Sequence, residues 1–247
     1  METETLLIIA FATFLFAGTM KGIVGIGLPS ATVSILSQFT DPRHAIALLL
    51  LPSVISNVWQ VYRTGYFMVG VRTLLPFAIM LFVFIWLFSQ LAATLSVETL
   101  VLGCGVAIVL FVLSNVILKP YEIPPRLDFP FQIGAGLVGG IMGGLTAIWA
   151  PAMAPYLVGK KLSKDDFVGA LGFLILAGTF PLLFGYIQAG LLTGERAVQS
   201  AIMIIPTLAG FWLGEQLRKR VDGKQFRALF LFVFFLMGLN LIRRALF

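Results

Sequence analysis

The chain has 247 residues, of which 59% are hydrophobic and only 11% charged, and its formal net charge is +6. Soluble domains carry about a quarter charged residues, so the composition excludes a soluble globular protein. It predicts an all-α polytopic membrane protein with about eight to ten membrane segments. The positive charge is then expected to orient the chain in the bilayer, and no nucleic-acid partner is expected.

The first apolar run, residues 5–40, contains an unusual segment at 18–30, GTMKGIVGIGLPS. Glycine allows backbone angles that other residues avoid, and proline starts a new helical turn at little cost. Gly22, Gly25, Gly27 and Pro29 therefore predict a helix break at membrane depth. Such a break must be buried in protein or line a water-filled cavity, because lipid cannot satisfy free backbone polar groups.

Lys21 is the charged residue inside this run, and no Asp or Glu lies within an apolar run to pair with it. A cation at membrane depth costs several kcal/mol unless it finds a partner or reaches the membrane surface. Three partners stay open for Lys21: a substrate anion, the carbonyls at the tip of a hairpin, or the polar groups of the cytoplasmic interface.

Further uncharged runs cover residues 45–62, 73–97, 99–118, 129–159, 167–194 and 197–214. Each is as long as the ~17–25 residues that a membrane-spanning helix needs. Within the first of these runs, Ser53, Ser56, Asn57 and Gln60 follow roughly helical spacing. Polar residues in this pattern either line a pore or make hydrogen bonds between helices.

A second glycine-rich segment, GLVGGIMGGLTAIWAP at 136–151, matches the first. The two align over three glycines at an offset of 118 residues, which pairs Gly25 with Gly143, and after an insertion of four residues Pro29 pairs with Pro151 at an offset of 122. Chance alignment of apolar, glycine-rich segments is the alternative to a duplication. We predict a first repeat at 1–118, a linker at 119–128 and a second repeat at 129–247, together one transmembrane domain.

The basic residues predict the path of both glycine-rich segments. If each segment crosses the membrane once, nine basic residues lie on one side and seven on the other; if each is a hairpin, the division is twelve to four. The twelve are Arg63, Arg72, Lys119, Arg126, Lys160, Lys161, Lys164, Arg218, Lys219, Arg220, Lys224 and Arg227, and the four are Arg43, Arg196, Arg243 and Arg244. Cytoplasmic loops carry the excess of Lys and Arg, so hairpins are favoured, with both termini on the non-cytoplasmic side.

Hairpins that begin on opposite sides give two inverted-topology repeats, each a broken or re-entrant hairpin plus three transmembrane helices. In secondary transporters with this plan, the substrate site forms where the broken helices meet near the midplane. Half-helices that begin after the breaks present N–H groups and partial positive charge to an anion. The candidate substrate-binding residues are Lys21, Gly22, Gly25, Gly27, Pro29, Ser30, Asn57, Gly140, Gly143, Gly144, Thr146, Trp149 and Pro151.

The segments KGIVGIGLPSATVSIL and GGIMGGLTAIWAPAMAPYLV resemble the two glycine-rich breaks of the sulfite exporter TauE/SafE family, also called the toluene-sulfonate uptake permease family. The similarity runs over nearly the whole chain. It implies an integral protein of the bacterial inner membrane that transports sulfite, organosulfonates or related sulfur-containing or carboxylate anions.

A carrier is the leading hypothesis, and a small-anion channel is the alternative, because re-entrant hairpins also build selectivity filters. One histidine, His44, and one cysteine, Cys104, leave little from which to build an enzyme or a metal site. We expect no enzymatic activity, no cofactor and no metal. The expected partners are the small anion and membrane lipids, and a homo-oligomer is left open.

Overall fold

A computed structural model of the chain describes residues 3–117, 121–217 and 223–247. Within these residues the chain is helical and no strand occurs, as the composition predicts. The elements are α1 (Thr3–Val24), α2 (Leu28–Leu36), α3 (Pro42–Thr64), α4 (Phe67–Thr94), α5 (Val97–Ile117), the 3₁₀ turn η1 (Pro125–Leu127), α6 (Asp128–Thr146), α7 (Ala150–Gly159), α8 (Lys164–Gln188), α9 (Gly194–Ile202), α10 (Ile204–Leu217) and α11 (Gly223–Leu246).

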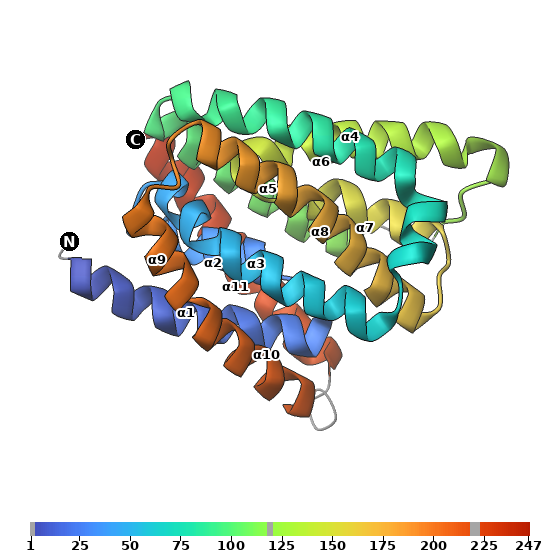
Figure 1. The fold of residues 1–247 in the computed structure, drawn as a ribbon, viewed down its shortest axis with the longest axis horizontal. Helices are drawn as coiled ribbons and strands as arrows, with labels where there is room; N and C mark the ends of the chain where they lie inside the picture. Colours follow the sequence, from blue (N-terminus) through green and yellow to red (C-terminus); the bar gives the residue numbers. More distant parts are fainter. Residues whose placement is uncertain (1–2, 118–120, 218–222) are drawn as a thin grey trace.

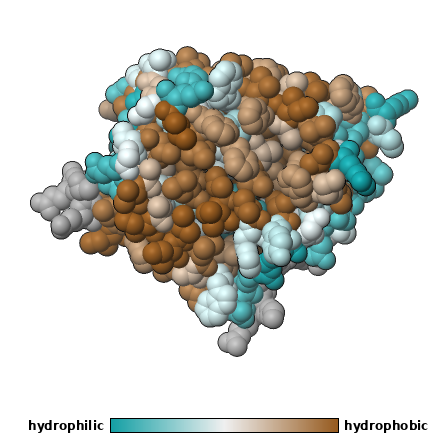
Figure 2. All heavy atoms as spheres, in the orientation of Figure 1, coloured by the Kyte–Doolittle hydropathy of each residue, from teal (hydrophilic) through white to brown (hydrophobic). Residues whose placement is uncertain are grey.

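Seven helical segments among the described residues are long and apolar enough to span a membrane. They are Thr5–Val24, Pro42–Thr64, Phe67–Thr94, Val97–Ile117, Pro125–Thr146, Asp165–Gln188 and Gly194–Leu217. Figure 2 shows hydrophobic residues across the middle of one face of the bundle and hydrophilic residues mainly toward its left and right ends. The chain is thus an integral, polytopic membrane protein.

Both chain termini lie at one end of the bundle, which we call the terminal end (Figure 1). The start of α3 and the end of α4 also lie at this end (Figure 1). They contact each other there, because the Arg43 guanidinium donates to the carbonyl of Ala92 at 3.0 Å. Arg244 donates to the carbonyl of Gln38 at 2.7 Å and ties the C-terminal helix to the turn after α2. All four basic residues predicted for the side of the termini are thus in elements that reach this end.

The opposite end holds residues 121–127, which precede α6, and is called the linker end because they belong to the predicted linker (Figure 1). Lys160, after α7, pairs with Asp128 at the start of α6 at 2.9 Å. Arg63, at the end of α3, pairs with Glu215, near the end of α10, at 2.6 Å. Of the basic residues predicted to share this side, Lys119, Arg218, Lys219 and Arg220 lie outside the described residues.

Each glycine-rich segment forms a broken helical hairpin, and equivalent points of the two hairpins lie 122 residues apart. α1 ends at Val24 and α6 at Thr146, while α2 begins at Leu28 and α7 at Ala150. This single offset, on both sides of the break, differs from the sequence alignment, which needs an insertion of four residues. At an offset of 122 residues Gly143 pairs with Lys21 rather than with Gly25, and the duplication itself stays a prediction.

The long helices of residues 3–117 pack on helices of residues 128–246, and α4 packs on both α6 and α8. α1 packs on α10 and α6 packs on α4, while α3 packs on α8 and α5 on α11 (Figure 1). At the α1–α10 crossing the backbones touch through glycines: a Cβ on Gly22 would lie 2.3 Å from the carbonyl oxygen of Phe211, and one on Gly214 2.1 Å from that of Thr19. Small residues allow this close approach between membrane helices.

Candidate functional site

The first break separates α1 from α2 and consists of Gly25, Ile26 and Gly27. The amide of Gly25 donates to the carbonyl of Lys21 at 2.7 Å and closes α1. Gly25 and Gly27 have φ angles of 87° and 114°, left-handed values that favour glycine. Pro29 follows in the first turn of α2, where its missing N–H removes no helical hydrogen bond. These residues explain why the helix breaks here and starts again at once.

The second break separates α6 from α7 and consists of Ala147, Ile148 and Trp149. Ala147 closes α6 with a φ of 58°, a left-handed value that is costly for a residue with a side chain. The amide of Ile148 donates to the hydroxyl of Thr146 at 3.2 Å. The predicted site residue Thr146 therefore holds the second break in place by a side-chain hydrogen bond.

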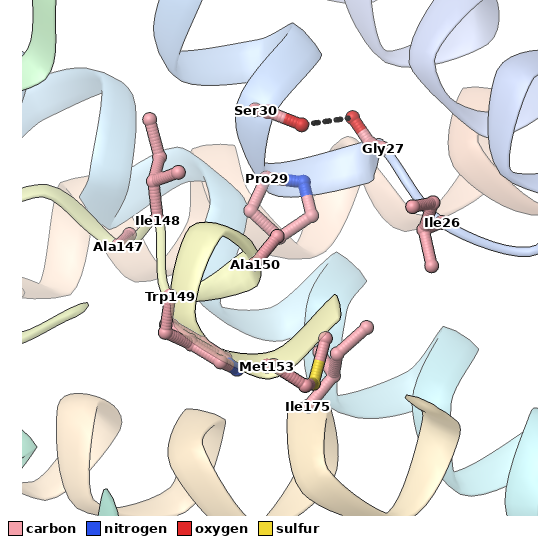
Figure 3. A pocket seen from close by; sticks show the side chains of 10 residues that line it. All are labelled: Ile26, Gly27, Pro29, Ser30, Ala147, Ile148, Trp149, Ala150, Met153 and Ile175. Atoms are coloured by element: carbon pink, nitrogen blue, oxygen red, sulfur yellow. Dashed lines mark hydrogen bonds between the residues drawn. The ribbon is translucent and has the colours of Figure 1, made fainter. Parts of the chain in front are cut away.

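The two breaks meet in the bundle and line one small cavity of about 20 Å³, the break cavity (Figure 3). In Figure 3, Pro29 at the start of α2 lies across from Ala150 at the start of α7. A cavity of this size holds about one water molecule. Its lining consists of Ile26, Gly27, Pro29, Ser30, Ala147, Ile148, Trp149, Ala150, Met153 and Ile175.

The polar groups at the break cavity include hydrogen-bond donors, beside the Ser30 hydroxyl and the Gly27 carbonyl, which bond to each other at 3.3 Å. α2 and α7, of nine and ten residues, both begin there, and the first amides of a helix lack helical partners and carry partial positive charge. Trp149 is 3% exposed, and its Nε1 has no hydrogen-bond partner among the described residues. The indole nitrogen points toward Met153, another residue of the lining (Figure 3). This chemistry suits an anion.

Lys21 lies in the last turn of α1, on the linker-end side of the first break. Its side chain is 2% exposed, and Nζ donates to Ser56 Oγ at 3.0 Å and to Asn57 Oδ1 at 2.6 Å. The ion pairs found among the described residues do not include Lys21. Its protein partners are thus two neutral oxygens of α3, a possibility that the sequence did not reveal.

A larger cavity of about 210 Å³, the Lys21 cavity, lies beside this side chain. Gly25 lines the Lys21 cavity, whereas Ile26 and Gly27 line the break cavity, so the first break separates the two. The complete lining of the Lys21 cavity is Lys21, Gly22, Gly25, Gln60, Arg63, Thr64, Asp165, Val168, Phe211 and Glu215.

A chain of buried hydrogen bonds leads from Lys21 to the break cavity. Nδ2 of Asn57, whose Oδ1 accepts from Lys21, donates to Ser53 Oγ at 3.1 Å. The hydroxyls of Ser53 and Thr179 lie 3.2 Å apart, and Thr179 donates to the carbonyl of Ile175 at 2.7 Å. Ile175 lines the break cavity. Ser53 and Asn57 therefore make hydrogen bonds between helices, Asn57 to α1 and Ser53 to α8. This is one of the two roles that their helical spacing predicted.

Gln60, the last of these polar residues, connects the first break with α8. Its Nε2 donates to the carbonyl of Val168 at 2.9 Å and to that of Gly25 at 3.4 Å. Its Oε1 is buried without a hydrogen-bond partner in the described part of the chain. Gln60 thus lines the Lys21 cavity and holds the backbone of the break at the same time.

The remaining predicted site residues lie away from both cavities. A Cβ on Gly140 would lie 2.5 Å from Cβ of Phe84, and one on Gly144 2.6 Å from Cβ of Phe88. Gly143 lies against the ring of Trp149. Close packing of α6 on α4 accounts for these glycines, and a contact with substrate stays a prediction for them. Pro151 lines a different, apolar hollow beside α5.

Six residues that line the break cavity were not among the predicted site residues: Ile26, Ala147, Ile148, Ala150, Met153 and Ile175. The first four belong to the breaks themselves or to the start of α7, whereas Met153 and Ile175 lie farther from the breaks in the sequence. Met153 lies three residues after Ala150 in α7, so helical periodicity from the second break would have found it. Ile175 comes from α8, and one isoleucine in an apolar run gives no signal of its position. In the described residues, no group of three His, Cys, Asp or Glu side chains is placed to hold a metal ion.

A family model described as sulfite exporter TauE/SafE matches residues 10–241. The match extends from α1 through both breaks into α11, so it includes every residue of the two cavities. No curated protein and no solved structure matches the chain.

Proposed function

The chain belongs to the sulfite exporter TauE/SafE family, and from this premise we propose that it is a carrier of sulfite, organosulfonates or related sulfur-containing or carboxylate anions. The observation that carries the proposal is the meeting of both helix breaks at one cavity. The anion binds there between the N-termini of α2 and α7. Lys21, on the other side of the first break, lines the larger cavity on the path to this site.

The donor groups at the break cavity support an anion rather than a cation as substrate. Helix N-termini bind sulfate, phosphate and carboxylate through free N–H groups and the helix dipole. The unpartnered Nε1 of Trp149 offers one more donor, and a buried donor without a partner costs about 1–3 kcal/mol until an acceptor arrives. An anion that fills the cavity removes this cost. At about 20 Å³ the cavity is too small for sulfite, so binding must widen it.

Two inverted repeats explain how the cavity widens. The contact of α1 with α10 and the contact of α6 with α4 are the same contact made twice, if α10 is the equivalent of α4. The pairs α3–α8 and α5–α11 then join each helix to its own equivalent across a pseudo-two-fold axis. Rocking of the two halves about this axis opens the break cavity alternately to the two ends of the bundle.

The charge at the two ends supports an orientation. Arg43, Arg196, Arg243 and Arg244 are in elements at the terminal end, and the more numerous basic residues are in elements at the linker end. By the positive-inside rule the linker end faces the cytoplasm of a bacterial inner membrane, and both termini face outward. The Lys21 cavity is then the cytoplasmic entrance to the anion site.

Transport by reconstituted protein tests the carrier. Liposomes loaded with unlabelled sulfite are expected to accumulate labelled sulfite transiently from outside, because a carrier exchanges its substrates through one site. The small size of the break cavity, about 20 Å³, supports a carrier over a channel. Unitary currents carried by sulfite, without this counterflow, would replace the carrier by the small-anion channel.

The substrate class is tested by thermal unfolding of the purified protein with sulfite, sulfate, thiosulfate, methanesulfonate and short carboxylates. A ligand at about 100 times its Kd stabilises the folded protein by about 2.7 kcal/mol. Sulfite or a sulfonate is expected to raise the midpoint of unfolding, and chloride at equal ionic strength is the control. If only carboxylates raised the midpoint of unfolding, the proposed substrate would be a carboxylate.

A further inference from the structure

We propose that Lys21 takes up a proton when an anion binds, so that the carrier moves a proton together with its anion. The inference rests on the proposed carrier function and names the coupling ion and the residue that holds it. Its basis is the set of partners of Lys21, the cavity beside it and the charges around that cavity.

The hydrogen bonds of Lys21 match those of a neutral amine. A protonated lysine has three N–H donors, whereas a neutral one has two donors and a lone pair. Nζ has two protein acceptors, Ser56 Oγ at 3.0 Å and Asn57 Oδ1 at 2.6 Å. The described residues therefore satisfy both donors of a neutral Lys21. The third donor of a protonated Lys21 needs an acceptor from the cavity that the side chain lines.

The charged groups around the Lys21 cavity come from three helices, and none of those described forms an ion pair with Lys21. Arg63 of α3 and Glu215 of α10 pair with each other at 2.6 Å. Asp165 is on the first turn of α8. The Phe211 ring centroid is 5.9 Å from Nζ, near the limit of cation–π attraction at about 6 Å. A buried cation without a contacting anion is costly, so these protein surroundings favour the neutral amine.

An anion that enters through the Lys21 cavity, and stays within reach of Nζ while it occupies the widened break cavity, reverses this preference. A proton from water at the linker end binds to the lone pair of Nζ, and the new N–H donates to an oxygen of the anion. One proton then enters with each singly charged anion, so the protein interior gains no net charge. When the anion leaves, the third donor loses its acceptor and the proton returns to water.

The second hairpin closes its first helix, α6, with no basic residue in the last turn. The equivalent position in the second hairpin is Gly143, where the ring of Trp149 occupies the space. The same helix end thus forms with and without a lysine. The difference between the hairpins therefore concerns chemistry at the first break, not formation of the break.

Proton uptake on anion binding tests the inference. Purified protein is titrated by calorimetry with methanesulfonate, and with sulfite above its own last ionisation, in two buffers of different ionisation enthalpy. These anions bring no proton, so any uptake belongs to the protein. We expect about one proton per anion bound, and an affinity that falls as pH rises, by up to about tenfold per pH unit.

Three variants assign the proton to Lys21. Lys21→Arg, which stays charged, and Lys21→Met, which carries no charge, are both expected to bind without proton uptake, the second more weakly. Lys161→Gln removes a lysine whose side chain is 59% exposed at the linker end, and it should keep the uptake. Anion binding by the wild type without proton uptake would overturn the inference and leave the carrier intact. Failure of both anions to bind would remove the carrier site as well.

Discussion

The hydroxyl of Ser200 donates to the carbonyl of Leu48 at 2.9 Å. This carbonyl lies four residues before Pro52, which has no N–H to offer it. The same hydroxyl accepts from the amide of Leu51 at 3.2 Å. One side chain of α9 therefore supplies hydrogen bonds to the backbone of α3 beside its proline. Ser56 and Asn57, which bond to Lys21, lie a few residues further along α3.

Ser200→Ala is expected to lower the free energy of unfolding by about 1–3 kcal/mol, because the buried carbonyl of Leu48 loses its hydrogen-bond donor. Ser200 is 0% exposed. Denaturant unfolding in detergent measures the effect. Ser114→Ala is the control, since the Ser114 hydroxyl only adds a bond to the Phe111 carbonyl of its own helix. Equal losses in the two variants would show that Ser200 does not support the proline.

Gly22→Ala is expected to separate α1 from α10 and to cost about 1–3 kcal/mol of stability. The added Cβ would lie 2.3 Å from the carbonyl oxygen of Phe211, which is backbone and cannot turn away. Gly134→Ala on α6 is the matched control, because a Cβ there meets nothing within 4 Å. The thermal midpoints of both variants test this difference, and full tolerance of Gly22→Ala would contradict the close helix crossing.

Gly27→Ala is expected to cost about 1–3 kcal/mol of stability and to lower transport, because a φ of 114° is strained for a residue with a side chain. Counterflow of labelled sulfite and thermal unfolding measure the two effects. Gly194→Ala, where a Cβ meets nothing within 4 Å, should leave both unchanged. Normal transport by Gly27→Ala would mean that the break does not need this backbone angle.

Trp149→Phe removes the indole N–H and keeps most of the ring. Hydrogen bonds to charged groups contribute about 1.5–3 kcal/mol, so anion affinity should fall about 10–100-fold. Trp212→Phe is the control, because Trp212 is 60% exposed on the surface of the bundle. Titration calorimetry with sulfite measures both. Unchanged affinity in Trp149→Phe would take the indole out of the site.

The sequence was sufficient to predict the membrane class, both breaks and their return as hairpins, because glycine, proline and charge act locally. The glycine alignment pairs the two segments at an offset of 118 residues before the breaks, whereas the ends of α1 and α6 lie 122 residues apart, and the duplication stays a prediction. The glycines at 136, 140 and 144 recur every four residues, so a slip by one helical turn leaves the alignment almost as good. Only the helix ends, at Val24 and Thr146, fix the register.

The division of the site into two cavities could not be predicted from the sequence. Lys21, Gly25 and Gly27 are close in the chain, yet the backbone turn at the break directs them to different cavities. The partners of Lys21 come from α3, some 35 residues away, and local patterns do not determine such contacts. The helical spacing of the polar residues at 53–60 placed them on one helix, but it did not show which helices they would face.

The location of a bound anion tests the central claim most directly. Selenite has the shape and charge of sulfite, and its selenium gives an anomalous X-ray signal. In crystals soaked with selenite, the peak is expected between the starts of α2 and α7, within hydrogen-bond distance of Trp149 Nε1. A selenium site elsewhere in a protein that still transports sulfite would contradict an anion site at the meeting of the two breaks.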